Sequence, residues 1–247
     1  MSREHYSYSV YADPATARSF DERRFGGPIG HLIAEEQARV LDEFVGDAGA
    51  RSVLDVGTGT GRAAIQMAQR GAQVTGVDAS EPMLAVARRR AADAGLDVRF
   101  LAGDAHELAF ADREFDVVIS LRVLMHTPDW RRSLAELCRV SGRLVIFDYP
   151  AAMSFAALQS GARHLTHALG AHTEPYRVFR ERAVAGALQM QGFRLRVAHR
   201  QFVLPIALHK AIGSRRFSLM SRTLSERTGL LGLFGTPVTV AAERCES

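Results

Sequence analysis

The chain has 247 residues, a length that suits one large domain, or a core domain with an insertion, rather than two equal domains. Hydrophobic residues make up 47% and charged residues 23%, which excludes a disordered tail, a collagen-like fibre and a disulfide scaffold. The net charge of +4 is uneven, because residues 1–150 carry a net of −4 and residues 151–247 a net of +8. With no apolar leader and no run long enough to cross a bilayer, we expect a cytoplasmic protein with free thiols at Cys138 and Cys245.

The first fifty residues predict an N-terminal helical cap, residues 1–50, which Gly26, Gly27 and Pro28 interrupt. From residue 52 onward, short apolar strands alternate with amphipathic helices. The predicted strands are 52–56, 73–78, 98–101, 115–121 and 143–147. The predicted helices are 62–70, the segment between Ser80 and Gly95, and 127–140, with Thr127 as its cap and Pro128 in its first turn.

This alternation predicts right-handed βαβ units, a parallel sheet and therefore an α/β fold with helices on both faces. After the cap we expect a ligand-binding core at 51–150 and a helical lid or substrate region at 151–190. The last strands of the core fall within 191–247, at 193–204 and 238–242, with a helical insertion at 205–236 between them.

A glycine-rich turn, Asp55-Val56-Gly57-Thr58-Gly59-Thr60-Gly61, joins the first of these strands to a helix. Glycines let a backbone approach a ligand closely, and the helix N-terminus offers free N–H groups. A dinucleotide fingerprint needs glycine at the position that Arg62 occupies, and a phosphate-binding loop needs a Gly-Lys-Ser/Thr sequence that is absent. The turn therefore argues against NAD and ATP.

Two further acids follow the next two predicted strands. Asp78 ends the second strand, where a carboxylate can accept hydrogen bonds from both hydroxyls of a ribose. Asp104 ends the third and can accept from an adenine amino group. Each acid alone is equally well explained as a turn or capping residue, but together with the glycine turn they predict a nucleoside ligand.

These residues, with Gly76-Val77-Asp78-Ala79-Ser80, Gly103-Asp104-Ala105 and Phe115-Asp116-Val117-Val118-Ile119-Ser120, resemble the class I S-adenosylmethionine (SAM)-dependent methyltransferases. The similarity is to their ubiquinone/menaquinone-type group, and it is close over about residues 30–148. It implies a Rossmann-like fold with a mostly parallel seven-stranded sheet, whose last strand is antiparallel, and a SAM-binding core at 51–150.

The resemblance also implies roles for individual residues in binding SAM and its product S-adenosylhomocysteine. The glycine turn would face the methionine part of SAM, with Asp55 shaping the loop. Asp78 would hold the ribose hydroxyls, and Asp104 and Ala105 the adenine. The full set of implied cofactor-binding residues is Asp55, Gly57, Thr58, Gly59, Gly61, Asp78, Ala79, Asp104, Ala105, Ser120 and Leu121.

The acceptor side of the site is less well defined by the sequence. His126 follows the fourth strand and is either a general base, if the acceptor must lose a proton, or a histidine that only packs at a helix entry. Arg122 either orients a substrate or lies on the surface. Asp148 and Tyr149 end the fifth strand and are candidate substrate contacts. His164, His167 and His172 lack a carboxylate or thiol to complete a metal site, so we expect no metal.

Residues 176–227 carry eleven Lys and Arg but only Glu181 and Glu226, interleaved with apolar residues. This pattern fits a pair of core-packing helices with a solvated basic face, or a surface that contacts the inner face of an anionic membrane. A contact with a nucleic-acid backbone is a weaker alternative.

We therefore expect a SAM-dependent methyltransferase that acts on oxygen or carbon of a small, hydrophobic, lipid- or quinone-like acceptor. One alternative is an O-methyltransferase of a polar secondary metabolite with His126 as its base. Another is a non-catalytic SAM-binding partner subunit. The sequence does not indicate an oligomeric state.

Overall fold

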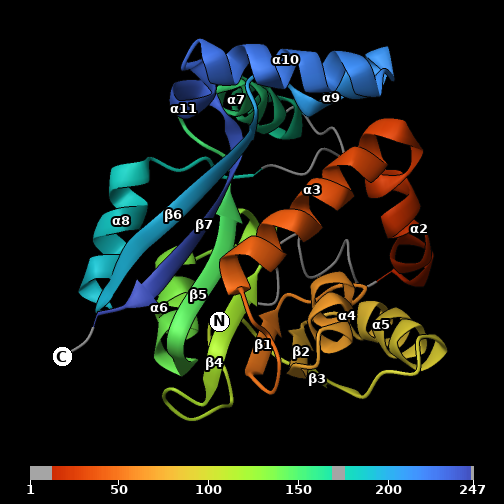
Figure 1. The fold of residues 1–247 in the computed structure, drawn as a ribbon, viewed down its shortest axis with the longest axis vertical. Helices are drawn as coiled ribbons and strands as arrows, with labels where there is room; N and C mark the ends of the chain where they lie inside the picture. The colour runs from red at the N-terminus through yellow and green to blue at the C-terminus, as the bar shows by residue number, and fades with distance from the viewer. Residues whose placement is uncertain (1–12, 169–175, 246–247) are drawn as a thin grey trace.

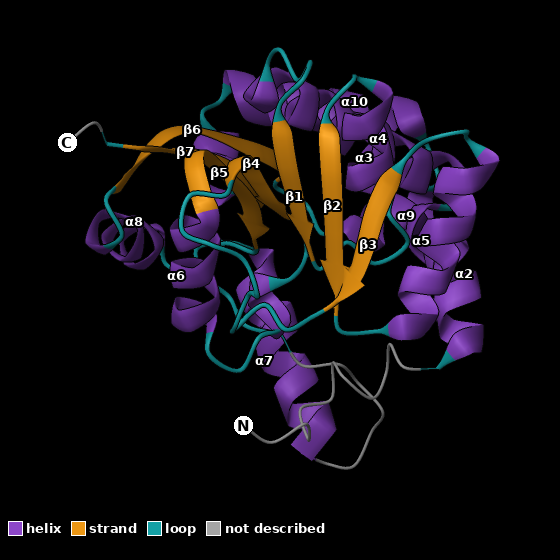
Figure 2. Ribbon diagram, turned by 90° about the horizontal axis from the view of Figure 1, so that it is seen from below, coloured by secondary structure: helices purple, strands orange, loops and turns teal. Residues whose placement is uncertain are grey.

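The computed structural model of the protein describes residues 13–168 and 176–245, which form a single seven-stranded sheet with helices on both faces (Figures 1 and 2). The strands are β1 (Ser52–Val56), β2 (Gln73–Asp78), β3 (Val98–Ala102), β4 (Phe115–Ser120), β5 (Ser141–Tyr149), β6 (Phe193–Phe202) and β7 (Thr236–Arg244). Their order across the sheet is β3-β2-β1-β4-β5-β7-β6, in which β1 to β5 are parallel and β7 is antiparallel to both neighbours. The predicted Rossmann-like sheet with its antiparallel last strand is confirmed.

The helices follow the strands in the order that the sequence predicts. Those of the first half are α2 (Pro14–Phe25), α3 (Gly27–Val45), α4 (Arg62–Gln69), α5 (Glu81–Asp93), the 3-10 turn η1 (Leu124–His126) and α6 (Trp130–Val140). Those of the second half are α7 (Phe155–Ala168), α8 (Glu181–Met190), α9 (Ile206–Ile212), α10 (Arg215–Arg227) and α11 (Leu230–Phe234).

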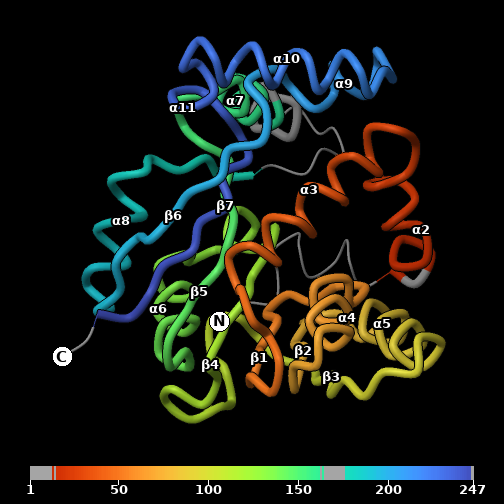
Figure 3. The backbone as a smooth tube through the Cα atoms, viewed as in Figure 1, coloured from red at the N-terminus to blue at the C-terminus, as the bar shows by residue number. Residues whose placement is uncertain are grey.

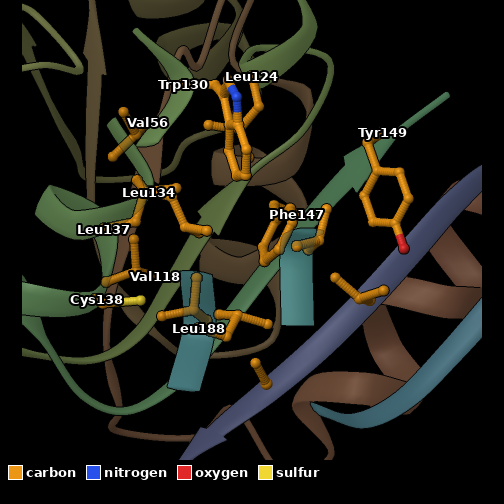
Figure 4. Close-up of a cluster of buried hydrophobic side chains, with 14 of the residues drawn as sticks. Val56, Val118, Leu124, Trp130, Leu134, Leu137, Cys138, Phe147, Tyr149 and Leu188 are labelled. Carbon is orange, nitrogen blue, oxygen red and sulfur yellow. The ribbon is translucent and has the colours of Figure 1, made fainter. Parts of the chain in front are cut away.

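Alternating side chains of the strands supply two hydrophobic layers, one on each face of the sheet. Leu54 and Val118 point into the layer that α6 and α8 cover, which Figure 4 shows in close-up. Val53 and Val117, one residue earlier on the same strands, point into the layer that α3, α4 and α5 cover. The central strands are therefore buried on both faces, as a parallel sheet requires.

Helix α6 begins two residues later than the sequence predicts. Asp129, not Thr127, is its cap, because the Asp129 carboxylate accepts from the backbone N–H groups of Arg131 and Arg132, at 3.2 Å each. The Thr127 hydroxyl instead donates to the carbonyl of Leu124, the first residue of η1. The segment 124–127 is thereby a separate turn beside the strand ends.

The region predicted as a lid, residues 151–190, divides into two parts. Val184 and Leu188 of α8 are buried in the hydrophobic layer with α6, so α8 packs on the core. Helix α7 lies beyond the end of β5, and Figure 2 shows it well apart from α10.

The predicted insertion 205–236 is helical and consists of α9, α10 and α11 between β6 and β7. It returns to the N-terminal part of the chain, as the trace in Figure 3 shows, with α9 and α10 against α3. Lys210 donates from Nζ to the carbonyls of Arg23 and Arg24, at 3.2 and 2.9 Å, at the end of α2. This link ties the insertion to the helix that closes the site described next.

Candidate cofactor-binding and active site

A cavity of about 200 Å³ lies at the carboxyl ends of β1 to β4, where the glycine-rich turn, the loops after β2 to β4 and helix α2 meet. Most of the predicted site residues line it. They are Asp55, Gly57, Thr58, Gly59, Asp78, Ala79, Asp104, Ala105, Leu121, Arg122 and His126. Gly61, Ser120 and Tyr149 do not.

The glycine turn needs glycine for two different reasons. Gly57 has φ +70°, and a Cβ there would lie 2.2 Å from Cγ2 of Val123, so any side chain would displace the loop after β4. Gly59 has φ +54°, and a Cβ there would meet no described atom within 4 Å. Because Gly59 lines the cavity, its missing side chain leaves room for a ligand. Gly61 is the N-cap of α4 with φ +81°, and a Cβ there would lie 3.0 Å from the Cβ of Ala87 on α5.

Asp55 at the end of β1 is buried and holds this turn together. One carboxylate oxygen, Oδ2, accepts from the Thr58 hydroxyl at 2.7 Å and from the Ala64 backbone N–H at 3.1 Å. Burial raises the pKa of Asp55 to about 6, and the two hydrogen bonds oppose that rise only in part. Asp55 therefore fixes the position of the loop relative to α4.

Asp78 is positioned by two backbone groups. Its Oδ2 accepts from the N–H of Gly59 and its Oδ1 from the N–H of Ser80, at 2.8 Å each. Burial raises the pKa of Asp78, while these two hydrogen bonds favour its ionised form. Each oxygen keeps acceptor capacity on the cavity side, which suits a pair of neighbouring hydroxyl groups.

Asp104 after β3 is oriented by His106, a residue that the sequence analysis did not single out. Oδ1 of Asp104 accepts from the backbone N–H of His106 at 2.9 Å and lies 2.7 Å from its Nδ1. Nε2 of the buried His106 accepts from the backbone N–H of Asp129 at 3.4 Å, which places the ring proton on Nδ1. The only signal in the sequence was a histidine two residues beyond the acid.

Helix α2 forms the remaining wall of the cavity, with Phe20, Arg24 and Phe25. Asp21 fastens this helix to the rest of the site, because it accepts from the Thr60 hydroxyl at 3.0 Å and forms an ion pair with Arg90 on α5. These residues precede the first strand by some thirty positions, and their charged and aromatic sequence carries no motif that would have pointed to the site.

Two residues predicted beside the ligand are buried elsewhere. Ser120 is fully buried at the end of β4, and the next residue, Leu121, lines the cavity. Tyr149 packs in the hydrophobic layer between Phe147 and Phe179 and does not line the cavity (Figure 4). In both cases the side chain follows the strand alternation into the core.

Arg122 and Asp148 form a linked pair at the ends of β4 and β5. Arg122 has φ +65°, a left-handed conformation that is rare outside glycine, and its backbone N–H donates to Oδ1 of Asp148. Burial raises the pKa of Asp148, and the charge of Arg122 opposes that rise. A second cavity, of about 40 Å³, shares Arg24, Phe25, Gln37 and Arg122 with the first and is also lined by Asp148.

His126 ends η1 and lines the main cavity near Arg122. No group of three His, Cys, Asp or Glu side chains that could hold a metal occurs in the part of the chain that the structure describes. The side chains of His164 and His167 and the whole of His172 lie outside that part.

This chain is similar to known proteins in sequence and in fold. Residues 53–142 match the family model described as a methyltransferase domain. A ubiquinone biosynthesis O-methyltransferase of Stutzerimonas stutzeri is 35% identical over 164 residues, which are 64% of this chain and 69% of that protein. The chain belongs to the class I SAM-dependent methyltransferases.

Two more relatives show how far this class I similarity extends. A demethylmenaquinone methyltransferase of Thermus thermophilus is 44% identical over 105 residues, so the match spans about half of that protein (48%) and 40% of this chain. The crystal structure of a magnesium protoporphyrin IX methyltransferase from Synechocystis with bound S-adenosylhomocysteine matches 97% of this chain and 98% of that one. Its TM-score is 0.69 and its identity 19%, which is a likeness of fold.

SAM, the methyl donor of these methyltransferases, suits the residues that line the cavity. Asp78 presents two carboxylate oxygens already oriented by backbone N–H groups, and Gly59 leaves open the space that a Cβ would fill. Asp104 presents a third acceptor at the end of the next strand. Asp78 would hold the ribose of SAM, Gly59 would lie beside its methionine part, and Asp104 would hold its adenine.

Proposed function

We propose that this protein transfers the methyl group of SAM to oxygen or carbon of a small, hydrophobic, lipid- or quinone-like acceptor. The observation that carries the proposal is one cavity in which Asp78, Asp104 and the glycine turn adjoin an apolar wall containing Phe20, Phe25 and Leu121. A quinone-type acceptor is supported by two relatives of the chain, a ubiquinone biosynthesis O-methyltransferase and a demethylmenaquinone methyltransferase.

SAM, when bound, supplies a methyl group already activated on a sulfonium sulfur. The tasks left to the chain are to hold the donor in one orientation, to exclude water and to align the acceptor. Asp55 and Asp78 fix the glycine turn, while the α2 wall encloses the site opposite it. A proton acceptor is needed only if the acceptor atom must lose a proton.

Incubation of the purified protein with methyl-labelled SAM and a total extract of the source cells tests this proposal. Label that partitions into the organic phase, with formation of S-adenosylhomocysteine, is the expected result. Label only in the aqueous phase would refute the hydrophobic acceptor, and nuclease treatment would then separate a polar metabolite from RNA. SAM binding without any S-adenosylhomocysteine would instead favour a non-catalytic partner subunit.

A second candidate function is O-methylation of a polar metabolite with His126 as the general base. His126 is favoured for this task because it lines the cavity beside the loop after β4. For such an enzyme we expect His126→Ala to lose turnover while it retains SAM affinity. The matched control is His31→Ala, a change at an exposed histidine on α3. Unchanged turnover in His126→Ala would exclude this histidine as a base.

A further inference from the structure

The helices inserted between β6 and β7 expose an unusual number of apolar side chains. Of the twelve large hydrophobic side chains that the described residues expose, eight belong to α9, α10 and α11. We call these eight the insertion face: Leu208, Ile212, Leu219, Met220, Leu224, Leu230, Leu233 and Phe234. Three others, Met153, Phe155 and Leu158, lie in or just before α7.

Helix α10 is amphipathic in the opposite sense to an ordinary surface helix. Its buried residues are Ser218 and Ser225, two turns apart on the side that faces the protein. Met220 and Leu224, by contrast, are 72% and 64% exposed. A helix that only covered a core would direct its leucines inward and its serines outward. The outward apolar side therefore fits a partner outside the chain.

Basic residues flank this apolar side. Arg216 and Arg227 stand near the two ends of α10, both exposed, and neither forms an ion pair with any residue that the structure describes. In contrast, Arg215 is paired with Glu35, and Arg222 with Glu36 and Glu226. Unpaired guanidinium groups beside exposed leucine and methionine are the combination that binds an anionic lipid surface.

We propose that the insertion face docks on an anionic membrane, with its apolar side chains among the lipids and Arg216 and Arg227 at the headgroups. A symmetric dimer through this face would offer Arg216 and Arg227 no free acid, because Glu226, the one acid of α9, α10 and α11, is paired with Arg222. A nucleic acid would leave the eight apolar side chains without a partner. No helix in the described ranges is long and apolar enough to cross a bilayer, so the contact is peripheral.

Docking there would place the membrane close to the site. Ile206, the first residue of α9, lines the smaller cavity, whose wall also contains Arg24 and Arg122 of the main cavity. The Lys210 hydrogen bonds hold α9 against the end of α2. A lipid-dissolved acceptor would then have a short path to the site, an extension that rests on the proposed function, whereas the docking itself does not.

Co-sedimentation of the full chain with vesicles tests the proposal. We expect binding to phosphatidylcholine vesicles that contain phosphatidylglycerol and little binding to phosphatidylcholine alone. The pair Met220→Asp with Leu224→Asp, and the pair Arg216→Glu with Arg227→Glu, should each weaken the vesicle partition roughly tenfold or more. The matched controls Met190→Asp on α8 and Arg89→Glu on α5, both at exposed positions, should bind as the wild type does.

Four results would overturn the proposal. The first is a wild type that does not bind the anionic vesicles, and the second is paired variants that bind as well as their controls. The third is a lipid-free dimer that Met220→Asp with Leu224→Asp converts to monomer, and the fourth is binding of RNA in place of vesicles. Calorimetric SAM affinity, measured on every variant, shows that the fold is intact and reports on the proposed function separately.

Discussion

The buried carboxyl of Asp55 makes the stability of the protein depend on pH in a way that Asp55→Asn isolates. Burial raises the pKa of Asp55 from 3.8 to about 6. Below about pH 3 the group is protonated in both the folded and the unfolded chain. As the pH rises toward 6, the unfolded chain gives up this proton first, so the free energy of unfolding falls. The difference between the two pKa values corresponds to about 3 kcal/mol.

Urea unfolding of the wild type and Asp55→Asn at pH 4, 5, 6 and 7 measures this contribution. Asparagine keeps an oxygen that can accept from Thr58 and Ala64, so the change removes mainly the charge. Between pH 4 and pH 7 we expect the free energy of unfolding of the wild type to fall by about 2 kcal/mol relative to that of the variant, because part of the full effect is already present at pH 4. Other titrating groups cancel in this comparison because both proteins contain them.

Asp116→Asn provides a control of opposite sign. The backbone N–H of Ser52 holds the pKa of Asp116 below its ordinary value, so Asp116 stabilises the fold above the unfolded pKa and loses that effect as the pH falls. The free energy of unfolding of the wild type should therefore increase relative to that of Asp116→Asn as the pH rises. A difference in the free energy of unfolding between the wild type and Asp55→Asn that stays constant from pH 4 to pH 7 would refute the reasoning about Asp55.

Three further predictions concern the site and the thiols. Asp78→Ala should weaken SAM binding about a hundredfold in calorimetry, the loss of two charge-assisted hydrogen bonds; unchanged affinity would remove the ribose assignment. Gly57→Ala should destabilise the fold and weaken SAM binding, whereas Gly186→Ala, in an open helical position on α8, should stabilise by up to about 1 kcal/mol in urea unfolding. Native protein should take up one iodoacetamide, at the exposed Cys245, because burial raises the pKa of Cys138 to about 12; two labels before unfolding, counted by mass spectrometry, would contradict this.

The sequence predicted the strand ends well because carboxylates and glycines there occur at positions that a βα turn requires. Asp55, Asp78 and Asp104 follow consecutive apolar strands, and parallel strands bring their carboxyl ends to one edge. The side-chain direction at a strand end was harder to predict. Ser120 and Leu121 differ by one position, yet only Leu121 lines the cavity. A single residue of strand alternation decides this, and the end of a strand is uncertain by about that much.

The α2 wall could not be predicted for a different reason. Asp21 accepts a hydrogen bond from Thr60, 39 positions later in the sequence, and Arg24 and Arg122 line one cavity only because α2 folds back over the strand ends. No local periodicity encodes such a contact. The inverted amphipathicity of α10 also depended on the structure, since a pattern of leucines and serines does not reveal which side faces the protein.

The connection through α9, α10 and α11 leaves and re-enters the sheet at one place. Phe202 at the end of β6 and Thr236 at the start of β7 are register partners on neighbouring antiparallel strands, whose Cα atoms lie about 5 Å apart. Whatever chain joins them closes the same short gap, so its length and composition are not constrained by the sheet. Natural selection can therefore lengthen, shorten or replace this segment, and change what the protein attaches to, while the edge that holds the nucleoside stays as it is.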